Sequence, residues 1–109
     1  MKRLSIVIVT YNSEKDIFDC VKTIQKYADI PLSEIELIVV DNNSRETDIM
    51  FAQLQQLYGN DIVLIKNTRN GGYGQGNNIG IRKAKAPVIL IMNPDVRLME
   101  PVFKMAVLP

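Results

Sequence analysis

The sequence predicts an α/β fold, namely a doubly wound, mostly parallel sheet with helices on both faces, of the Rossmann-like kind. Four short runs rich in valine and isoleucine are almost continuously apolar, as strands covered on both faces must be. These predicted strands are residues 4–10, 36–40, 62–65 and 88–92. The segments between them have helical spacing, and crossovers of about 20 residues favour parallel neighbours over hairpins.

The first helix is predicted directly after the first strand. Apolar residues recur there at intervals of three and four, at Ile17, Cys20, Val21, Ile24 and Ala28. Ser13, followed three residues later by Asp16, resembles a capping box and places the start of this helix.

The second helix is predicted from the same spacing, at Met50, Leu54, Leu57 and Tyr58. Either Asn43 or Ser44 is expected to cap its start, because short polar side chains accept hydrogen bonds from the first free amides. Gly59 lies where the helix should end.

The third crossover contains five glycines within residues 71–80, and residues 69–76 carry strong loop signals. Inside a helix each glycine costs about 1 kcal/mol against alanine, so we favour a functional loop. The alternative is a helix packed tightly against the sheet. The segment lacks the Gly-Lys-Ser/Thr ending of a phosphate loop, and a dinucleotide fingerprint would follow the first strand instead.

Composition sets broader limits on the function. The 109 residues, 47% of them hydrophobic with a formal net charge of +1, fit one compact domain and do not suit a nucleic-acid binder. The single cysteine, Cys20, excludes an intramolecular disulfide, so a reducing, cytoplasmic setting is expected. No apolar run reaches the length of a membrane span, and peripheral contact at the inner face of a membrane stays open.

Polar residues follow the carboxyl end of every predicted strand. In doubly wound sheets ligands bind outside these ends, beside the point where the strand order reverses. The segments concerned are Thr10-Tyr11-Asn12, Asp41-Asn42-Asn43, Asn67 with residues 69–72, and Asn93-Pro94-Asp95. Their common position is the main evidence from the residues for a ligand site.

Each of these groups has a plainer alternative role. The carboxylate of Asp41 could accept hydrogen bonds from a base or ribose, or it could cap a helix. Asp95 could bridge Mg²⁺ or Mn²⁺ to a diphosphate, or its tripeptide could be only a turn. Tyr11 could stack on a base or cover the sheet edge, and Arg69 could meet phosphate or solvent.

Four segments together resemble the N-terminal half of family 2 inverting glycosyltransferases of the GT-A fold, and most closely the rhamnosyltransferase-like group. The segments are IVIVTYN at 6–12, ELIVVDNNS at 36–44, NGGYGQGNNIG at 70–80 and LIMNPDV at 90–96. The resemblance implies that the first two surround the base and ribose, that residues 70–78 cover the nucleotide and sugar, and that Asn93-Pro94-Asp95 stands at the metal-binding Asp-x-Asp motif. With Asn93 replacing the first acid, Asp95 alone is the predicted metal ligand. The predicted nucleotide-binding residues are Thr10, Tyr11, Asn12, Asp41, Asn43, Asn70, Gly71, Gly72, Asn78 and Asn93.

The resemblance implies a domain that binds a dTDP-, UDP- or GDP-sugar with Mg²⁺ or Mn²⁺, for transfer to a saccharide or lipid-linked acceptor in cell-surface polysaccharide synthesis. Family members continue into a half that supplies the general base, and nothing after Met99 fills that role. Residues 1–109 are therefore expected to be one truncated donor-binding domain, inactive alone, whose open edge favours self-association. Two alternatives remain. A Rossmann-like oxidoreductase or nucleotidyltransferase domain is disfavoured because residues 10–14 lack glycine. A noncatalytic binding or assembly module stays open.

Overall fold

The computed structural model describes residues 1–59 and 61–108 and confirms the predicted α/β class. All strand pairs are parallel in a sheet of order β3-β2-β1-β4, and the strand bounds differ from prediction by at most one residue at each end. The strands are β1 (Leu4–Thr10), β2 (Ile35–Asp41), β3 (Ile62–Lys66) and β4 (Val88–Ile91). The α-helices are α1 (Glu14–Tyr27), α2 (Thr47–Tyr58), α3 (Gly72–Lys83) and α4 (Phe103–Ala106), and a 3₁₀ turn, η1 (Leu32–Glu34), precedes β2.

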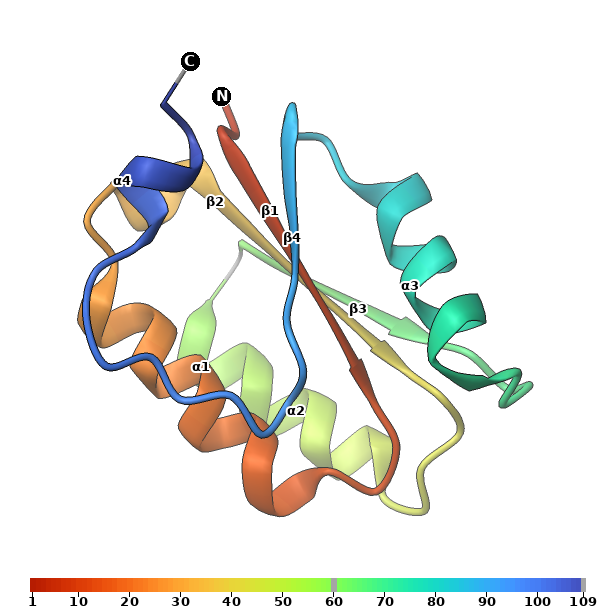
Figure 1. Cartoon of the computed structure of the whole chain (residues 1–109). Coiled ribbons are helices and arrows are strands. Elements are labelled where there is room, and N and C mark those ends of the chain that lie inside the picture. The colour runs from red at the N-terminus through yellow and green to blue at the C-terminus, as the bar shows by residue number, and fades with distance from the viewer. Residues whose placement is uncertain (60, 109) are drawn as a thin grey trace.

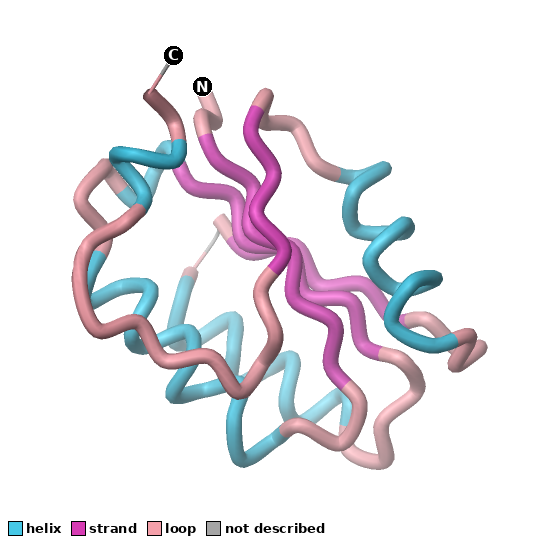
Figure 2. The backbone as a smooth tube through the Cα atoms, viewed as in Figure 1, coloured by secondary structure: helices cyan, strands magenta, loops and turns pink. Residues whose placement is uncertain are grey.

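The sheet forms a middle layer, with α1 and α2 on one face and α3 on the other (Figures 1 and 2). The central strands β1 and β2 are buried along their whole length, which explains why their sequences are apolar without alternation. Ser5 and Glu36 are buried polar residues of these strands, and the Ser5 hydroxyl donates a hydrogen bond to the Glu36 carboxylate at 2.8 Å. The Ser5 hydroxyl also accepts the backbone amide of Ala86, and the Glu36 carboxylate accepts that of Lys85. In the described part of the chain, no helix combines the length and apolarity needed to cross a bilayer.

The larger core lies between the sheet and the predicted stripe of α1. Ile17, Cys20, Val21 and Ile24 of α1 are all buried there. The C-terminal segment, blue in Figure 1, crosses α1 and buries Phe103 in the same core. This core fixes α1, and with it the loop that follows β1.

The predicted start of α1 at Ser13 is confirmed, but the capping box there and the predicted cap of α2 are wrong. Ser13 occupies the N-cap position of α1, yet its hydroxyl bonds the backbone of Tyr11 and does not cap the helix. Neither Asn43 nor Ser44 caps α2, because that helix begins only at Thr47 and the Ser44 hydroxyl donates to Asp41 instead. The predicted end of α2 at Gly59 is confirmed.

The glycine-rich segment is helical from Gly72 onward, so the loop prediction is wrong there and the tightly packed helix is correct. A Cβ atom on Gly80 would lie 2.4 Å from Cγ1 of Val7, and one on Gly76 would lie 2.8 Å from Cγ1 of Val9. These distances are too short for any side chain, so the glycines allow the backbone of α3 to rest directly on the sheet. A smaller valine- and isoleucine-rich core seals this face.

Gly80→Ala should lower the free energy of unfolding by about 1–3 kcal/mol, because Val7 is short and stiff and cannot move aside cheaply. Gly74→Ala is the matched control in the same helix. Its added Cβ meets nothing within 4 Å, so alanine should be neutral or stabilise by up to about 1 kcal/mol. Urea unfolding of both variants checks the prediction, and equal effects would contradict close packing at Gly80.

Candidate functional site

The carboxyl ends of the strands meet at one edge of the sheet, as the sequence predicts. Thr10 pairs in register with Asp41, and Asp41 with Lys66, so these strand ends lie side by side. The strand order reverses at β1, with β2 and β3 on one side and β4 on the other. A parallel sheet offers its ligand crevice at this place.

The carboxylate of Asp41 is the centre of this edge and is 1% exposed. One oxygen accepts hydrogen bonds from the hydroxyls of Thr10 at 2.7 Å and Ser44 at 2.5 Å. The other accepts the Ser44 amide at 2.8 Å and the Thr47 hydroxyl at 2.7 Å. All four donors belong to the protein, so Asp41 fixes the loop between β2 and α2 and ties it to β1.

These hydrogen bonds keep Asp41 ionised. Burial of the carboxyl raises its pKa, but the donors on Ser44, Thr47 and Thr10 together outweigh burial and hold the pKa below its ordinary value. The candidate site therefore contains an ionised carboxylate. Its oxygen lone pairs already accept hydrogen bonds from the protein.

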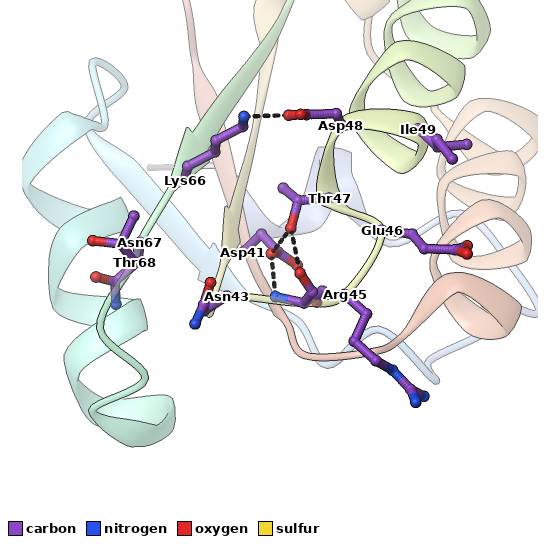
Figure 3. A pocket seen from close by; sticks show the side chains of 11 residues that line it. Asp41, Asn43, Arg45, Glu46, Thr47, Asp48, Ile49, Lys66, Asn67 and Thr68 are labelled. Carbon is purple, nitrogen blue, oxygen red and sulfur yellow. Dashed lines mark hydrogen bonds and ion pairs between the residues drawn. The ribbon is translucent and has the colours of Figure 1, made fainter.

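A cavity of about 510 Å³ opens beside Asp41, between the ends of β2 and β3 and the start of α2 (Figure 3). Its volume falls in the range of small-molecule sites. Lys66 forms an ion pair with Asp48 across it, while the Arg45 side chain points away from Asp41. The lining residues are Asp41, Asn43, Ser44, Arg45, Glu46, Thr47, Asp48, Ile49, Lys66, Asn67 and Thr68.

Two asparagines with positive φ shape the loops at this edge. Asn12 has φ 49° and Asn43 has φ 63°, a conformation that asparagine tolerates better than most residues. The side-chain oxygen Oδ1 of Asn12 accepts the Arg45 backbone amide at 3.1 Å, and the backbone amide of Asn12 donates to the Ser44 hydroxyl at 2.8 Å. The loops after β1 and β2 are thus one unit, beside which the ring of Tyr11 is 54% exposed.

Asn42 is a buried residue of the candidate site to which the sequence interpretation gave no role of its own. It is 2% exposed, donates to the Gly72 carbonyl at 3.1 Å and accepts from Asn67 at 2.8 Å. Asn67 also donates to Gln75, which in turn accepts the Gly71 amide. These contacts join β2 and β3 to the start of α3. They span 25 and 30 residues of sequence, so no local pattern could reveal them.

The predicted residues of the glycine-rich segment separate into two groups. Asn70, Gly71 and Gly72 lie at the start of α3, where the Asn70 side chain accepts the Gly72 amide at 3.1 Å. Asn78 lies on the exposed face of α3, about 9 Å further along the helix axis. The structure brings the first three to the strand ends, and it leaves Asn78 apart from them.

Asn93, Pro94 and Asp95 form a turn after β4, closed by the Val96 amide donating to the Asn93 carbonyl at 3.1 Å. Pro94 is buried, whereas Asn93 and Asp95 are exposed. Within residues 1–59 and 61–108 the Asp95 carboxylate has no hydrogen-bond partner, and no three His, Cys, Asp or Glu side chains gather as a metal site. A cation here would have Asp95 as a single protein carboxylate.

Comparisons with known proteins agree with this geometry. Residues 5–108 match the sequence model of a family described as Glycosyl transferase family 2. The chain is 30% identical over 95 residues to the poly(ribitol-phosphate) beta-N-acetylglucosaminyltransferase TarS of Staphylococcus aureus, over 87% of this chain and 16% of TarS. It is 36% identical over 100 residues to the low-salt glycan biosynthesis hexosyltransferase Agl10 of Haloferax volcanii, over 87% of this chain and 28% of Agl10.

The fold is similar to a crystal structure of S. aureus TarS 1-349 in complex with UDP. The TM-score is 0.82 at 26% identity, and the match covers 95% of this chain and 30% of that chain. The chain thus spans less than a third of the length of these relatives.

Asp41→Asn should lower the free energy of unfolding at neutral pH by about 1–3 kcal/mol, because an amide group would face donors that need an acceptor. The folded-state pKa of Asp41 is depressed, so its stabilisation is complete above the unfolded value of about 3.9 and is lost as pH falls through the folded pKa. Urea unfolding at descending pH should show wild type and variant converging in acid. A gap that does not change with pH would exclude this role.

Proposed function

The chain belongs to glycosyl transferase family 2, and we propose that residues 1–109 hold the nucleotide of a sugar donor at the carboxyl ends of the strands. The observation that carries the proposal is the rigid polar edge built around Asp41, with a cavity of about 510 Å³ beside it. Crystal structures of the relative TarS, at 26% identity, contain UDP and UDP-GlcNAc. A UDP-sugar is therefore the first donor to test, ahead of dTDP- and GDP-sugars.

The base and ribose would lie over the joined loops after β1 and β2. The exposed ring of Tyr11 offers a stacking surface, and Asn43 lines the cavity with its polar side chain. In this arrangement Thr10 and Asp41 support the nucleotide indirectly, because their hydrogen bonds hold the loop after β2 in place. Asp41 is then a positioning residue, although the sequence predicts direct contact with the nucleotide.

The diphosphate would lie toward the start of α3 and the turn after β4. A helix N-terminus favours anions, and Asn70, Gly71 and Gly72 bring that of α3 to this edge. Asp95 fits a divalent cation because its carboxylate is exposed and unbonded in the described residues, so that phosphates and water would complete the coordination. When bound, Mg²⁺ or Mn²⁺ would stabilise the charge on the departing diphosphate.

We extend the proposal to donor binding and not to transfer by residues 1–109 alone. Asp41 is fully hydrogen-bonded, Asp48 is paired with Lys66, and Glu46 points away from Asp41 in Figure 3. Asp95 would hold the cation. None of these four acids is therefore placed to deprotonate an acceptor.

The acceptor class is proposed from the relatives. TarS is named for poly(ribitol-phosphate) and Agl10 for glycan biosynthesis, which supports a saccharide or lipid-linked acceptor in cell-surface polysaccharide synthesis. The rhamnosyltransferase-like subgroup, the cytoplasmic location and peripheral membrane contact stay predictions.

Calorimetric titration with UDP, UDP-GlcNAc, dTDP and GDP-mannose, each with Mn²⁺, tests the proposal. We expect UDP compounds to bind, and Tyr11→Ala to weaken binding by about 1–3 kcal/mol, the range for loss of base stacking. Tyr27→Ala, at the far end of α1, is the control and should bind like wild type. Absence of binding by the folded wild-type chain to every nucleotide would refute the proposal.

The cation site is tested separately. Asp95→Asn should remove the gain in UDP affinity that Mn²⁺ gives to wild type and leave metal-free binding nearly unchanged. Glu100→Gln removes an exposed acid from the same C-terminal segment and should keep the full Mn²⁺ effect. If Mn²⁺ does not strengthen UDP binding to wild type, Asp95 is not a metal ligand.

A further inference from the structure

The turn that carries Asp95 is held against α1 by the side chain of Arg97. Nη1 of Arg97 donates to the backbone carbonyl of Pro94 at 3.2 Å and to that of Val96 at 3.1 Å. Nη2 donates to the carboxylate of Asp16, in the first turn of α1, at 3.0 Å. Arg97 therefore bonds the carbonyls of the residues immediately before and after Asp95, and joins both of them to the helix.

The geometry of these bonds requires an arginine. A guanidinium is planar and always charged, and its fixed fork of N–H groups can meet a carboxylate and backbone carbonyls at once. The pair with Asp16 is partly exposed, and such pairs alone contribute little to stability. The bonds to the two carbonyls have a different effect, because they fix the orientation of the peptide groups that flank Asp95.

The charge of Arg97 is directed at α1 and not at Asp95. Its Nη2 lies 3.0 Å from Asp16 and 3.8 Å from Asp19, whereas Asp95 forms no ion pair in residues 1–59 and 61–108. The carboxylate next to Arg97 in sequence is thus left available to a cation. The segment that follows continues along α1 (Figure 1), where the Leu98 amide donates to the Thr23 hydroxyl at 3.1 Å.

We propose that Arg97 is a positioning residue of the cation site, which holds the turn so that Asp95 faces the diphosphate. The inference rests on the proposed function, because it takes Asp95 as the ligand of the cation. Partners that orient a metal ligand typically change metal affinity by about 10–100-fold. Since phosphates and water would also hold this ion, we expect a smaller effect here.

Calorimetric titration of UDP with and without Mn²⁺ measures this effect as a ratio of affinities. Arg97→Gln should lower the gain that Mn²⁺ gives at least about threefold relative to wild type. A variant that was merely less stable would bind UDP more weakly with and without Mn²⁺ alike, so its ratio would not change. Arg97→Lys keeps the charge but loses the fork, and its gain should lie between those of wild type and Arg97→Gln.

Amide hydrogen exchange, measured by NMR without nucleotide or metal, tests the hold on the turn independently. In Arg97→Gln the amides of Val96 and Leu98 should exchange at least about threefold faster than in wild type. The Met92 amide, bonded to the Val7 carbonyl of β1, is the internal reference.

Arg3→Gln is the matched control. It removes a second arginine–carboxylate pair of 3.0 Å, with Glu34, at the opposite end of the sheet. Both the Mn²⁺ gain and the exchange of the Val96 and Leu98 amides should stay as in wild type.

Unchanged exchange of the Val96 and Leu98 amides in Arg97→Gln would overturn the proposal whatever the chain binds. A full Mn²⁺ gain in Arg97→Gln, or an equal loss of gain in Arg3→Gln, would overturn it too. If exchange responds as expected but Mn²⁺ gives wild type no gain, the error lies in assigning the cation to Asp95, and the positioning role is refuted with that assignment. The exchange measurement thus separates a failure of this inference from a failure of the proposed function.

Discussion

The hydrogen bonds to the Asp41 carboxylate are the interaction on which the proposed site depends. A carboxylate that is 1% exposed is costly to bury, and here four donors from Thr10, Ser44 and Thr47 offset that cost. The same bonds set the path of the loop after β2, which through Ser44 and Arg45 also holds the loop after β1. The buried charge of Asp41 thus determines the shape of the loops after β1 and β2, at the carboxyl ends of the strands.

The close contact of α3 with the sheet is the second constraint. Gly76 and Gly80 let the helix rest on Val9 and Val7, and this fixes where the helix begins. Its start is then joined to β2 through the buried side chain of Asn42. The glycines therefore act on the site indirectly, by bringing the N-terminus of α3 to the carboxyl ends of the strands.

The fold was predictable from the sequence because strands buried on both faces leave continuous apolar runs, such as residues 4–10 and 36–40. The gathering of the polar residues that follow the four strands at one edge was predictable as well, because all strand pairs are parallel. The helix caps and α3 were not predictable in the same way. The Ser44 hydroxyl has a stronger hydrogen-bond partner in the Asp41 carboxylate than in a helix terminus. In α3, the close contact with β1 outweighs the free energy that glycine costs a helix, and only the folded structure reveals this contact. The role of Asn42 in joining β2 and β3 to α3 was not predictable, because its partners are distant in sequence.

The central claim is that the joined loops around Asp41 receive a nucleotide, and mapping amide chemical shifts while UDP-GlcNAc and Mn²⁺ are added tests it most directly. The account predicts that the largest changes fall on residues 11–13, 42–47 and 70–73, with little change on α1 beyond its first turn. A second cavity of about 410 Å³, lined by Lys22, Lys26 and Arg97 among others, provides the contrasting location. Shift changes centred on that cavity, or none at saturating ligand, would contradict the account.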